Sequence, residues 1–225
     1  MADNEEYTKK LENVIKQMLQ PLKDIPFNLV IEAMTSKKVI SFDFKKQDHQ
    51  EVLKLLKQSA VNAGKEINKT GILRPRPNEV GNDIEPYVRN ALNSLGLKAD
   101  VPIEPSGHKK AMGYPDILFW FNKTPYYLEC KTYNIENIKT TQRSFYFSPS
   151  DEFKVIYDAP HFILSYEIYV AGEKGYKHIY KCKHYKILSI ESLLLDVKYE
   201  FNSDNKRMYS GKDGTVILDE GDIER

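Results

Sequence analysis

The sequence predicts a mixed α/β (α+β) fold, in which helices flank a central β-sheet. Three segments space their apolar residues with the period of an amphipathic helix: 4–20, about 48–62 and about 84–95. Two strongly apolar segments, 116–121 and 126–132, predict strands joined by the turn 122–125. Two more strand candidates, 162–170 and 176–185, are linked by a glycine-containing turn, so the predicted sheet extends beyond the first hairpin.

The N-terminal region, residues 1–70, is predicted to hold two helices and a hairpin. One stripe of the first helix carries Tyr7, Leu11, Val14, Ile15, Met18 and Leu19. Pro21 and Pro26 end this pattern. Segments 28–34 and 38–44 predict two short strands around the polar turn 35–37, and Asp48 can cap the helix that follows.

The region from 71 to about 200 carries the remaining predicted elements. Alternating prolines hold 71–78 extended as a loop, and Asn82 or Glu85 is expected at the N-cap of helix 84–95. The other expectations are loop or irregular strand at 98–113, a strand at 143–147 and a helix at 190–197. The polar tail 201–225 has one edge-strand candidate, 215–218. We expect residues 1–225 to form a single domain.

Composition narrows the class of protein. The chain has 225 residues, 41% of them hydrophobic, and 33 Lys and Arg against 32 Asp and Glu give a net charge of +1. Binding to nucleic acid therefore requires that positive charge gather on one surface. The N-terminus is acidic and polar, apolar runs are too short to cross a bilayer, and Cys130 and Cys182 suggest no disulfide framework. A cytoplasmic protein is the expectation.

The hairpin 116–131 carries the residues with chemical potential. In Glu129-Cys130-Lys131 the side chains alternate, so Glu129 and Lys131 share one face of the strand while Cys130 points to the other. If Lys123 and Thr124 form the turn, Asp116 lies opposite Lys131 and diagonal to Glu129. Two carboxylates and a lysine at one end of a ribbon suit a Mg²⁺ site, where the lysine positions or deprotonates a water or stabilises negative charge. The alternative is a solvated surface ion cluster.

Pro115-Asp116, twelve residues, and then Glu129-Cys130-Lys131 resemble the PD-(D/E)xK motif of the restriction-endonuclease-like nucleases. The resemblance implies a central mixed sheet flanked by helices, with N-terminal helical and hairpin additions. It implies that one or two Mg²⁺ ions are bound by Asp116, Glu129 and the backbone carbonyl of Cys130, with Lys131 acting on the attacking water. An acid on the preceding helix often completes such sites. Glu85 fits that place, although Asp83 competes with it and Glu85 also suits a capping box.

The resemblance also implies a substrate. We expect a type II restriction endonuclease that acts as a homodimer on a palindromic, A/T-rich site in double-stranded DNA, with the N-terminal helices forming the dimer interface. Its cognate methyltransferase would work in the same host without a stable complex. Candidate DNA contacts are Arg74, Arg76, His108, Lys109, Lys110, Gln142 and Arg143. Gln142 and Tyr146 have the spacing of RecB-like nucleases, so a repair or recombination nuclease is the alternative, and an inactive DNA-binding protein is a second one.

Overall fold

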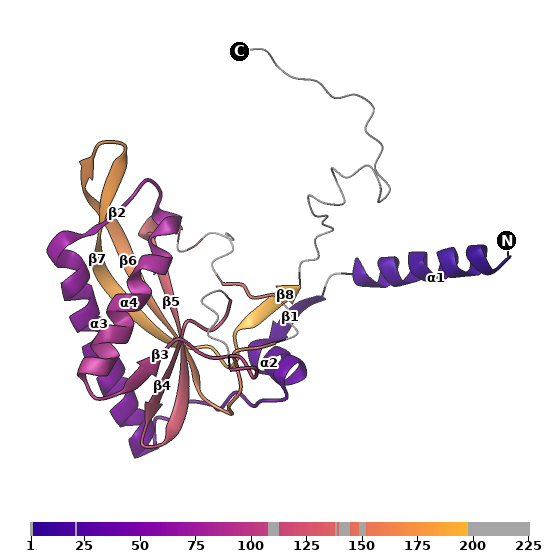
Figure 1. The fold of residues 1–225 in the computed structure, drawn as a ribbon, viewed down its shortest axis with the longest axis horizontal. Coiled ribbons are helices and arrows are strands. Elements are labelled where there is room, and N and C mark those ends of the chain that lie inside the picture. The colour runs from indigo at the N-terminus through magenta and orange to yellow at the C-terminus, as the bar shows by residue number, and fades with distance from the viewer. Residues whose placement is uncertain are drawn as a thin grey trace, which may run out of the picture. The chain divides into compact units, whose positions relative to one another are not determined.

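A six-stranded mixed β-sheet organises the chain, shown as a computed structural model in Figure 1. The structure describes residues 2–20, 22–107, 113–137, 139, 145–148 and 152–197. Contacts divide the chain into two units, with boundaries after Asp24 and after Leu194. The sheet and the residues of the predicted active site belong to the unit Ile25–Leu194.

The order of strands in the sheet is β2-β7-β6-β5-β4-β3. These strands are β2 (Ile72–Arg74), β3 (Lys98–Asp100), β4 (Ile117–Phe121), β5 (Thr124–Tyr133), β6 (His161–Lys174) and β7 (Lys177–Ser189). The central pair, β5 and β6, is parallel, whereas every other neighbouring pair is antiparallel. The mixed sheet predicted from the sequence is therefore confirmed, and the predicted strands 162–170 and 176–185 are parts of β6 and β7.

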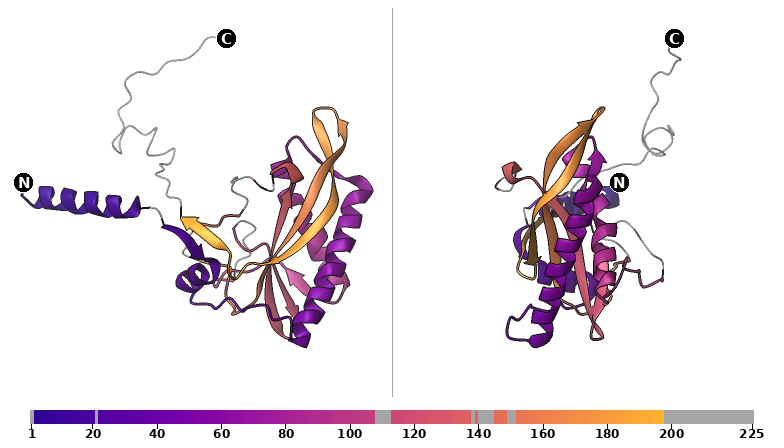
Figure 2. Two further views of the ribbon diagram at one scale, coloured as in Figure 1. Left: turned by 180° about the vertical axis from the view of Figure 1, so that it is seen from behind. Right: turned by 90° about the vertical axis from the view of Figure 1, so that its left-hand side faces the viewer.

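Helices α3 (Gln47–Thr70) and α4 (Gly81–Ser94) cover one face of this sheet, as the right-hand view of Figure 2 shows. Both helices turn an apolar stripe inward, with Val52, Leu56 and Ile67 from α3 and Ile84, Val88 and Leu92 from α4. The sheet supplies alternate residues to the same core, among them Leu128 and Cys130 of β5. The opposite face of β5 carries Tyr127, Glu129 and Lys131. The prediction that Cys130 points away from Glu129 and Lys131 is thus confirmed.

Helix α4 begins earlier than predicted. It starts at Gly81, with Val80 at the N-cap and no side-chain cap hydrogen bond. Asn82 and Glu85 therefore lie inside the helix, and the capping role considered for either residue is wrong. The physical reason is that Val80, Ile84 and Val88 are all buried and extend the apolar stripe one turn toward the N-terminus.

In the N-terminal region both predicted helices are confirmed, but the cap and the two strands are not. Helix α3 has Lys46 at its N-cap and no side-chain cap hydrogen bond, so Asp48 lies in the first turn and does not cap it. Helix α1 (Ala2–Met18) matches the predicted helix 4–20. The predicted strand 28–34 is instead helix α2 (Phe27–Thr35), because Phe27 and Ile31 are one turn apart and both buried. Segment 38–44 forms no strand; its only ladder contact is a parallel bridge between Val39 and Ala159.

The end of the described chain also differs from its prediction. Segment 190–197 was expected to be helical, but Leu194–Val197 forms strand β8, which pairs with β1 (Leu22–Pro26). Consecutive leucines do not distinguish the period of a helix from that of a strand. Pairing with β1, which is distant in the sequence, makes this segment a strand. In the predicted strand 143–147, only 145–147 is described, and it is not a strand; 215–218 lies outside the described residues. No described helix has the length and apolar character needed to span a membrane.

Candidate active site

The turn of the β4–β5 hairpin sets the position of Asp116. Phe121 pairs with Thr124, so Asn122 and Lys123 form the turn, with φ values of 47° and 66°. The predicted turn, Lys123-Thr124, is therefore wrong. Asn tolerates positive φ well, which favours the observed turn with Asn in its first position. Continuing the observed register places Asp116 opposite Glu129 instead of Lys131. The difference is two positions, so Asp116 keeps the predicted face.

The three motif residues meet at the end of this hairpin. The backbone N–H of Cys130 donates to Oδ2 of Asp116 at 2.7 Å, and Nζ of Lys131 donates to Oε1 of Glu129 at 2.6 Å. The Glu129 side chain is only 5% exposed, whereas that of Lys131 is 27% exposed. Within the described residues, Oε2 of Glu129 is buried and has no hydrogen-bond partner. The arrangement is thus a partly buried site, and the alternative of a fully solvated ion cluster does not fit it.

Burial and mutual repulsion shift the pKa values of the acids upward. Burial, followed by the charge of Asp116, raises the pKa of Glu129 to about 7. Burial also raises the pKa of Asp116, against the lowering effect of the Cys130 N–H. For Lys131, burial lowers the pKa, but the charge of Glu129 and its hydrogen bond outweigh burial, and the net shift is upward. Lys131 is therefore held in its cationic form.

Glu85 of helix α4 interacts electrostatically with this cluster. Burial and then the charge of Asp116 raise the pKa of Glu85 to about 7, which places its carboxyl group within electrostatic reach of the motif. The competing acid, Asp83, is engaged elsewhere. Arg74 donates to both of its carboxylate oxygens, at 2.6 and 2.7 Å. Of the two upstream acids, Glu85 is the one that interacts with Asp116.

Lys154 is a site residue that the sequence reasoning missed. It is 3% exposed, and its positive charge lowers the pKa values of Glu85, Asp116 and Glu129. Its segment is attached to the site face of β5, since Oη of Tyr127 accepts hydrogen bonds from the N–H groups of Ile156 at 2.8 Å and Tyr157 at 3.2 Å. No local pattern marks this lysine, because its burial results from tertiary docking of an irregular segment.

A neutral aromatic group forms the neighbouring wall of the site. His161 of β6 lies beside Tyr127 in the parallel register and stacks on Tyr114, whose hydroxyl contacts Nδ1 of His161. Burial lowers the pKa of His161 to about 3, so the ring is neutral. His161 is buried, and it adds no positive charge to the site.

The donor set fits a Mg²⁺ ion with partial hydration. Among the described residues, no group of three or more His, Cys, Asp and Glu side chains is arranged to hold a metal ion. Mg²⁺ commonly binds through one or two carboxylates and keeps several waters. Asp116, Oε2 of Glu129 and the carbonyl of Cys130 are oxygen atoms that could serve as its ligands, and within the described residues no donor competes with a cation for Oε2.

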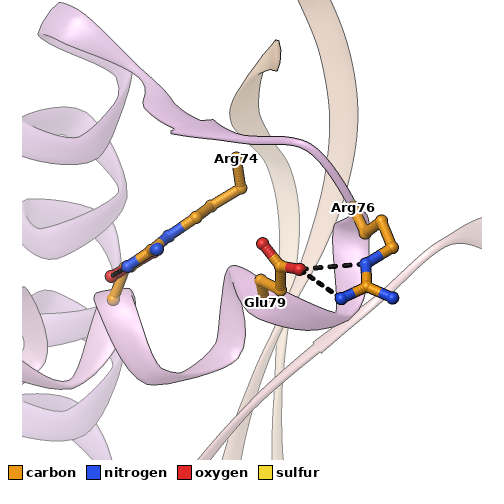
Figure 3. A network of polar contacts seen from close by, with 4 residues as sticks. Arg74, Arg76 and Glu79 are labelled. Carbon is orange, nitrogen blue, oxygen red and sulfur yellow. Dashed lines mark hydrogen bonds and ion pairs between the residues drawn. The ribbon is translucent and has the colours of Figure 1, made fainter. Parts of the chain in front are cut away.

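The predicted DNA contacts are only partly described. Arg74 pairs with Asp83, and Arg76 pairs with Glu79 at 2.8 Å, as Figure 3 shows for Arg76 and Glu79. Both arginines are therefore held by acids within the same stretch of chain, and their contact with DNA stays a prediction. The remaining candidates lie outside the described residues: His108, Lys109, Lys110, Gln142 and Arg143.

Comparisons with known proteins complete the description. A model of the type II restriction enzyme MjaV family matches residues 6–212. The type II restriction enzyme MjaV of Methanocaldococcus jannaschii is 35% identical over 237 aligned positions, which cover 98% of this chain and 99% of that protein. No solved structure gives a significant match.

Proposed function

Because this chain belongs to the type II restriction enzyme MjaV family, we propose that it is a Mg²⁺-dependent endonuclease that cuts double-stranded DNA at a specific palindromic site. Membership supports sequence-specific cleavage of DNA. The observation that supports the chemistry is the meeting of Asp116, Glu129 and Lys131, with one buried carboxylate oxygen free of donors among the described residues. Asp116, Glu129 and the Cys130 carbonyl would hold the metal.

Bound Mg²⁺ would lower the pKa of a water and neutralise charge that develops on the phosphate. Hydrogen bonds within the protein hold the reactive side chains in position. The Cys130 N–H fixes the carboxylate of Asp116, and the ion pair with Glu129 fixes the ammonium of Lys131. A cationic lysine at this position orients the attacking water and stabilises the negative transition state, and it is not suited to act as a base. Lys154 offsets the repulsion among the three acids.

Incubation of plasmid DNA with the purified protein and Mg²⁺ tests the proposal. We expect discrete fragments, and Asp116→Asn should abolish them while retaining the fold, because the amide cannot replace a carboxylate ligand. Progressive degradation would instead favour the alternative of a repair exonuclease. Absence of cleavage in both Mg²⁺ and Mn²⁺, with intact fold, would reject both nuclease functions and favour the inactive DNA-binding alternative.

We also propose that the enzyme acts as a homodimer through helix α1. The apolar stripe of this helix is exposed along its length: Tyr7, Leu11, Val14, Ile15 and Met18 are 40–61% exposed. A stripe of this kind on a charged helix is typical of a surface that is covered by a partner. A two-fold dimer would match the symmetry of a palindromic site and place one active site on each strand.

A further inference from the structure

Strand β7 concentrates positive charge that the active site does not use. The segment 177–186 contains Lys177, Lys181, Lys183 and Lys186, together with two histidines and no acid. The whole chain has a net charge of only +1, so this strand is a strong local excess. A protein that binds a polyanion needs such a concentration on one surface.

The register of the sheet places part of this charge on the face of the active site. Lys131 of β5 lies beside Ser165 of β6, and Ser165 lies opposite Lys186 of β7. Partners in register point to the same face, so Lys131 and Lys186 stand in one row, about 10 Å apart across two strand spacings. The ammonium of Lys186 lies 5.1 Å from the ring centre of Tyr133, which is two residues after Lys131 on β5. This contact confirms the shared face.

The same face continues along the β6–β7 hairpin. The pairing of β6 with β7 shifts by one residue between Cys182 and His184, which leaves Lys183 without a partner in the ladder. Beyond this shift, Lys181 lies opposite Tyr169. At the tip, Lys174 pairs with Lys177, and Tyr176 is 81% exposed. The protruding hairpin is visible in Figure 1 as the long orange ribbon of β6 and β7.

Acids neutralise only part of this surface. Glu167 pairs with Lys183 at 3.8 Å, and Glu173 contacts His178 at 3.3 Å. Within the part of the chain that the structure describes, the other four lysines form no ion pair with an acid: Lys174, Lys177, Lys181 and Lys186. These four residues, three on β7 and Lys174 at the end of β6, are termed the β7 basic row, and they remain available to an external anion.

We propose that the β7 basic row binds the phosphate backbone of the duplex on one side of the cleavage site. This inference rests on the proposed function and adds to it the location of the DNA. The ten residues from Lys186 to Lys177 extend about 30 Å, the length of roughly nine base pairs. A two-stranded ribbon is also narrow enough to follow a DNA groove. The row begins at Lys186, two strand spacings from Lys131 on the same face, so a duplex that follows it passes close to the proposed catalytic residues.

Binding of a fluorescein-labelled 40-base-pair duplex of mixed sequence tests this proposal. Fluorescence anisotropy is measured with Ca²⁺ in place of Mg²⁺, at several salt concentrations, on the full-length protein. We expect Lys181→Gln/Lys186→Gln to weaken binding at least tenfold and to reduce the salt slope by about 1.8, since each lost phosphate contact contributes about 0.9. The matched control, Lys54→Gln/Lys65→Gln, changes two exposed lysines of α3, on the helix-covered side, and should bind like the wild type.

A second pair of substitutions tests whether weaker binding could result from damage to the fold. Lys174→Glu/Lys177→Glu alters the tip of the hairpin and should also weaken binding and lower the salt slope, with an unchanged melting temperature. Equal affinity of wild type, row variants and α3 control would overturn the inference, as would an equal loss in the control. Wild-type cleavage of plasmid in Mg²⁺ is measured in parallel. If the wild type cleaves and the row variants bind normally, the proposed function stands and only this inference fails.

Discussion

Glu129 illustrates, at the scale of one residue, how a buried acid can be prepared for a cation. One of its oxygens accepts from Lys131, and the other is buried without a donor among the described residues. A buried polar atom without a partner costs about 1–3 kcal/mol, and more when it is charged. In the absence of metal, burial and the charge of Asp116 raise the pKa of Glu129 to about 7, so the carboxyl group takes up a proton only as the pH falls below that value.

The stabilising effect of Mg²⁺ should therefore depend on pH. Glu85 and Glu129 have folded pKa values of about 7 against 4.5 when unperturbed. Protonation stabilises the metal-free fold fully below pH 4.5, and this contribution is lost as pH rises through 7. Mg²⁺ competes with these protons. We expect it to raise the melting temperature by several degrees at pH 8 and little at pH 6, as measured by calorimetry. Equal shifts at both pH values, or a retained shift in Glu129→Gln, would contradict this.

Lys154 provides a second prediction at this scale. Replacement of Lys154 by Met removes a buried positive charge that faces three acids. Without Mg²⁺ at pH 8, we expect the free energy of unfolding in urea to fall by about 3 kcal/mol, since breaking a buried charge interaction leaves uncompensated charge. Added Mg²⁺ should restore more stability to this variant than to the wild type. Lys154→Arg keeps the charge and should lose less; equal losses in the two variants would mean that packing alone matters.

At the scale of elements, the side chains of β5 alternate between two roles: one set packs in the core and the other set faces the site. Leu128 and Cys130 pack under the helices, whereas Tyr127, Glu129 and Lys131 face the site. Tyr127 is the structural member of the second set, because its hydroxyl accepts two backbone hydrogen bonds from the segment that carries Lys154. Trp120 of β4 supports the same segment through an edge contact with Tyr157, with ring centres 5.1 Å apart.

Tyr127→Phe should detach this segment from β5. Two backbone N–H groups lose their acceptor, and we expect a loss of about 2 kcal/mol in stability together with slower single-turnover cleavage. Tyr126→Phe is the matched control, since Tyr126 is the adjacent residue on the helix-covered face. The control should leave the cleavage rate unchanged. An unchanged rate in Tyr127→Phe as well would show that docking of the segment is unimportant for catalysis.

At the scale of the whole molecule, the proposed dimer predicts the form of the cleaved product. Leu11→Asp/Ile15→Asp places charges on the apolar stripe of α1 and should give a monomer in sedimentation experiments. Because a monomer holds one active site, supercoiled plasmid should accumulate as nicked circles before linear DNA appears. Asn13→Asp/Gln17→Asp adds the same charge to the opposite side of α1 and should remain dimeric. A wild-type monomer that makes double-strand breaks would contradict the proposed assembly.

Sequence reasoning succeeded where local patterns were strong. The apolar hairpin, the alternation of Glu129 and Lys131, and long elements such as α3 and β6 all follow from periodicity. It failed where tertiary contacts decide. Segment 28–34 is part of a helix, because Phe27 and Ile31 lie one turn apart and are both buried. Within 190–197, Leu194–Val197 is a strand because it pairs with β1. Lys154 had no sequence signal, because its segment is attached to β5 through hydrogen bonds from Ile156 and Tyr157 to Tyr127, which no local pattern predicts.

The placement of the basic row on β7 has an evolutionary consequence. The row shares a rigid sheet with the catalytic strand but is separated from it by the whole width of β6. Substitutions of these lysines can accumulate without disturbing Leu128 and Cys130, the core positions that alternate with the proposed catalytic residues of β5. We therefore expect lineages of this enzyme to diversify along the hairpin and to preserve β5. Because contacts to the phosphate backbone carry no sequence information, such changes would alter the affinity for DNA and its salt dependence, and the choice of cleavage site would be unaffected.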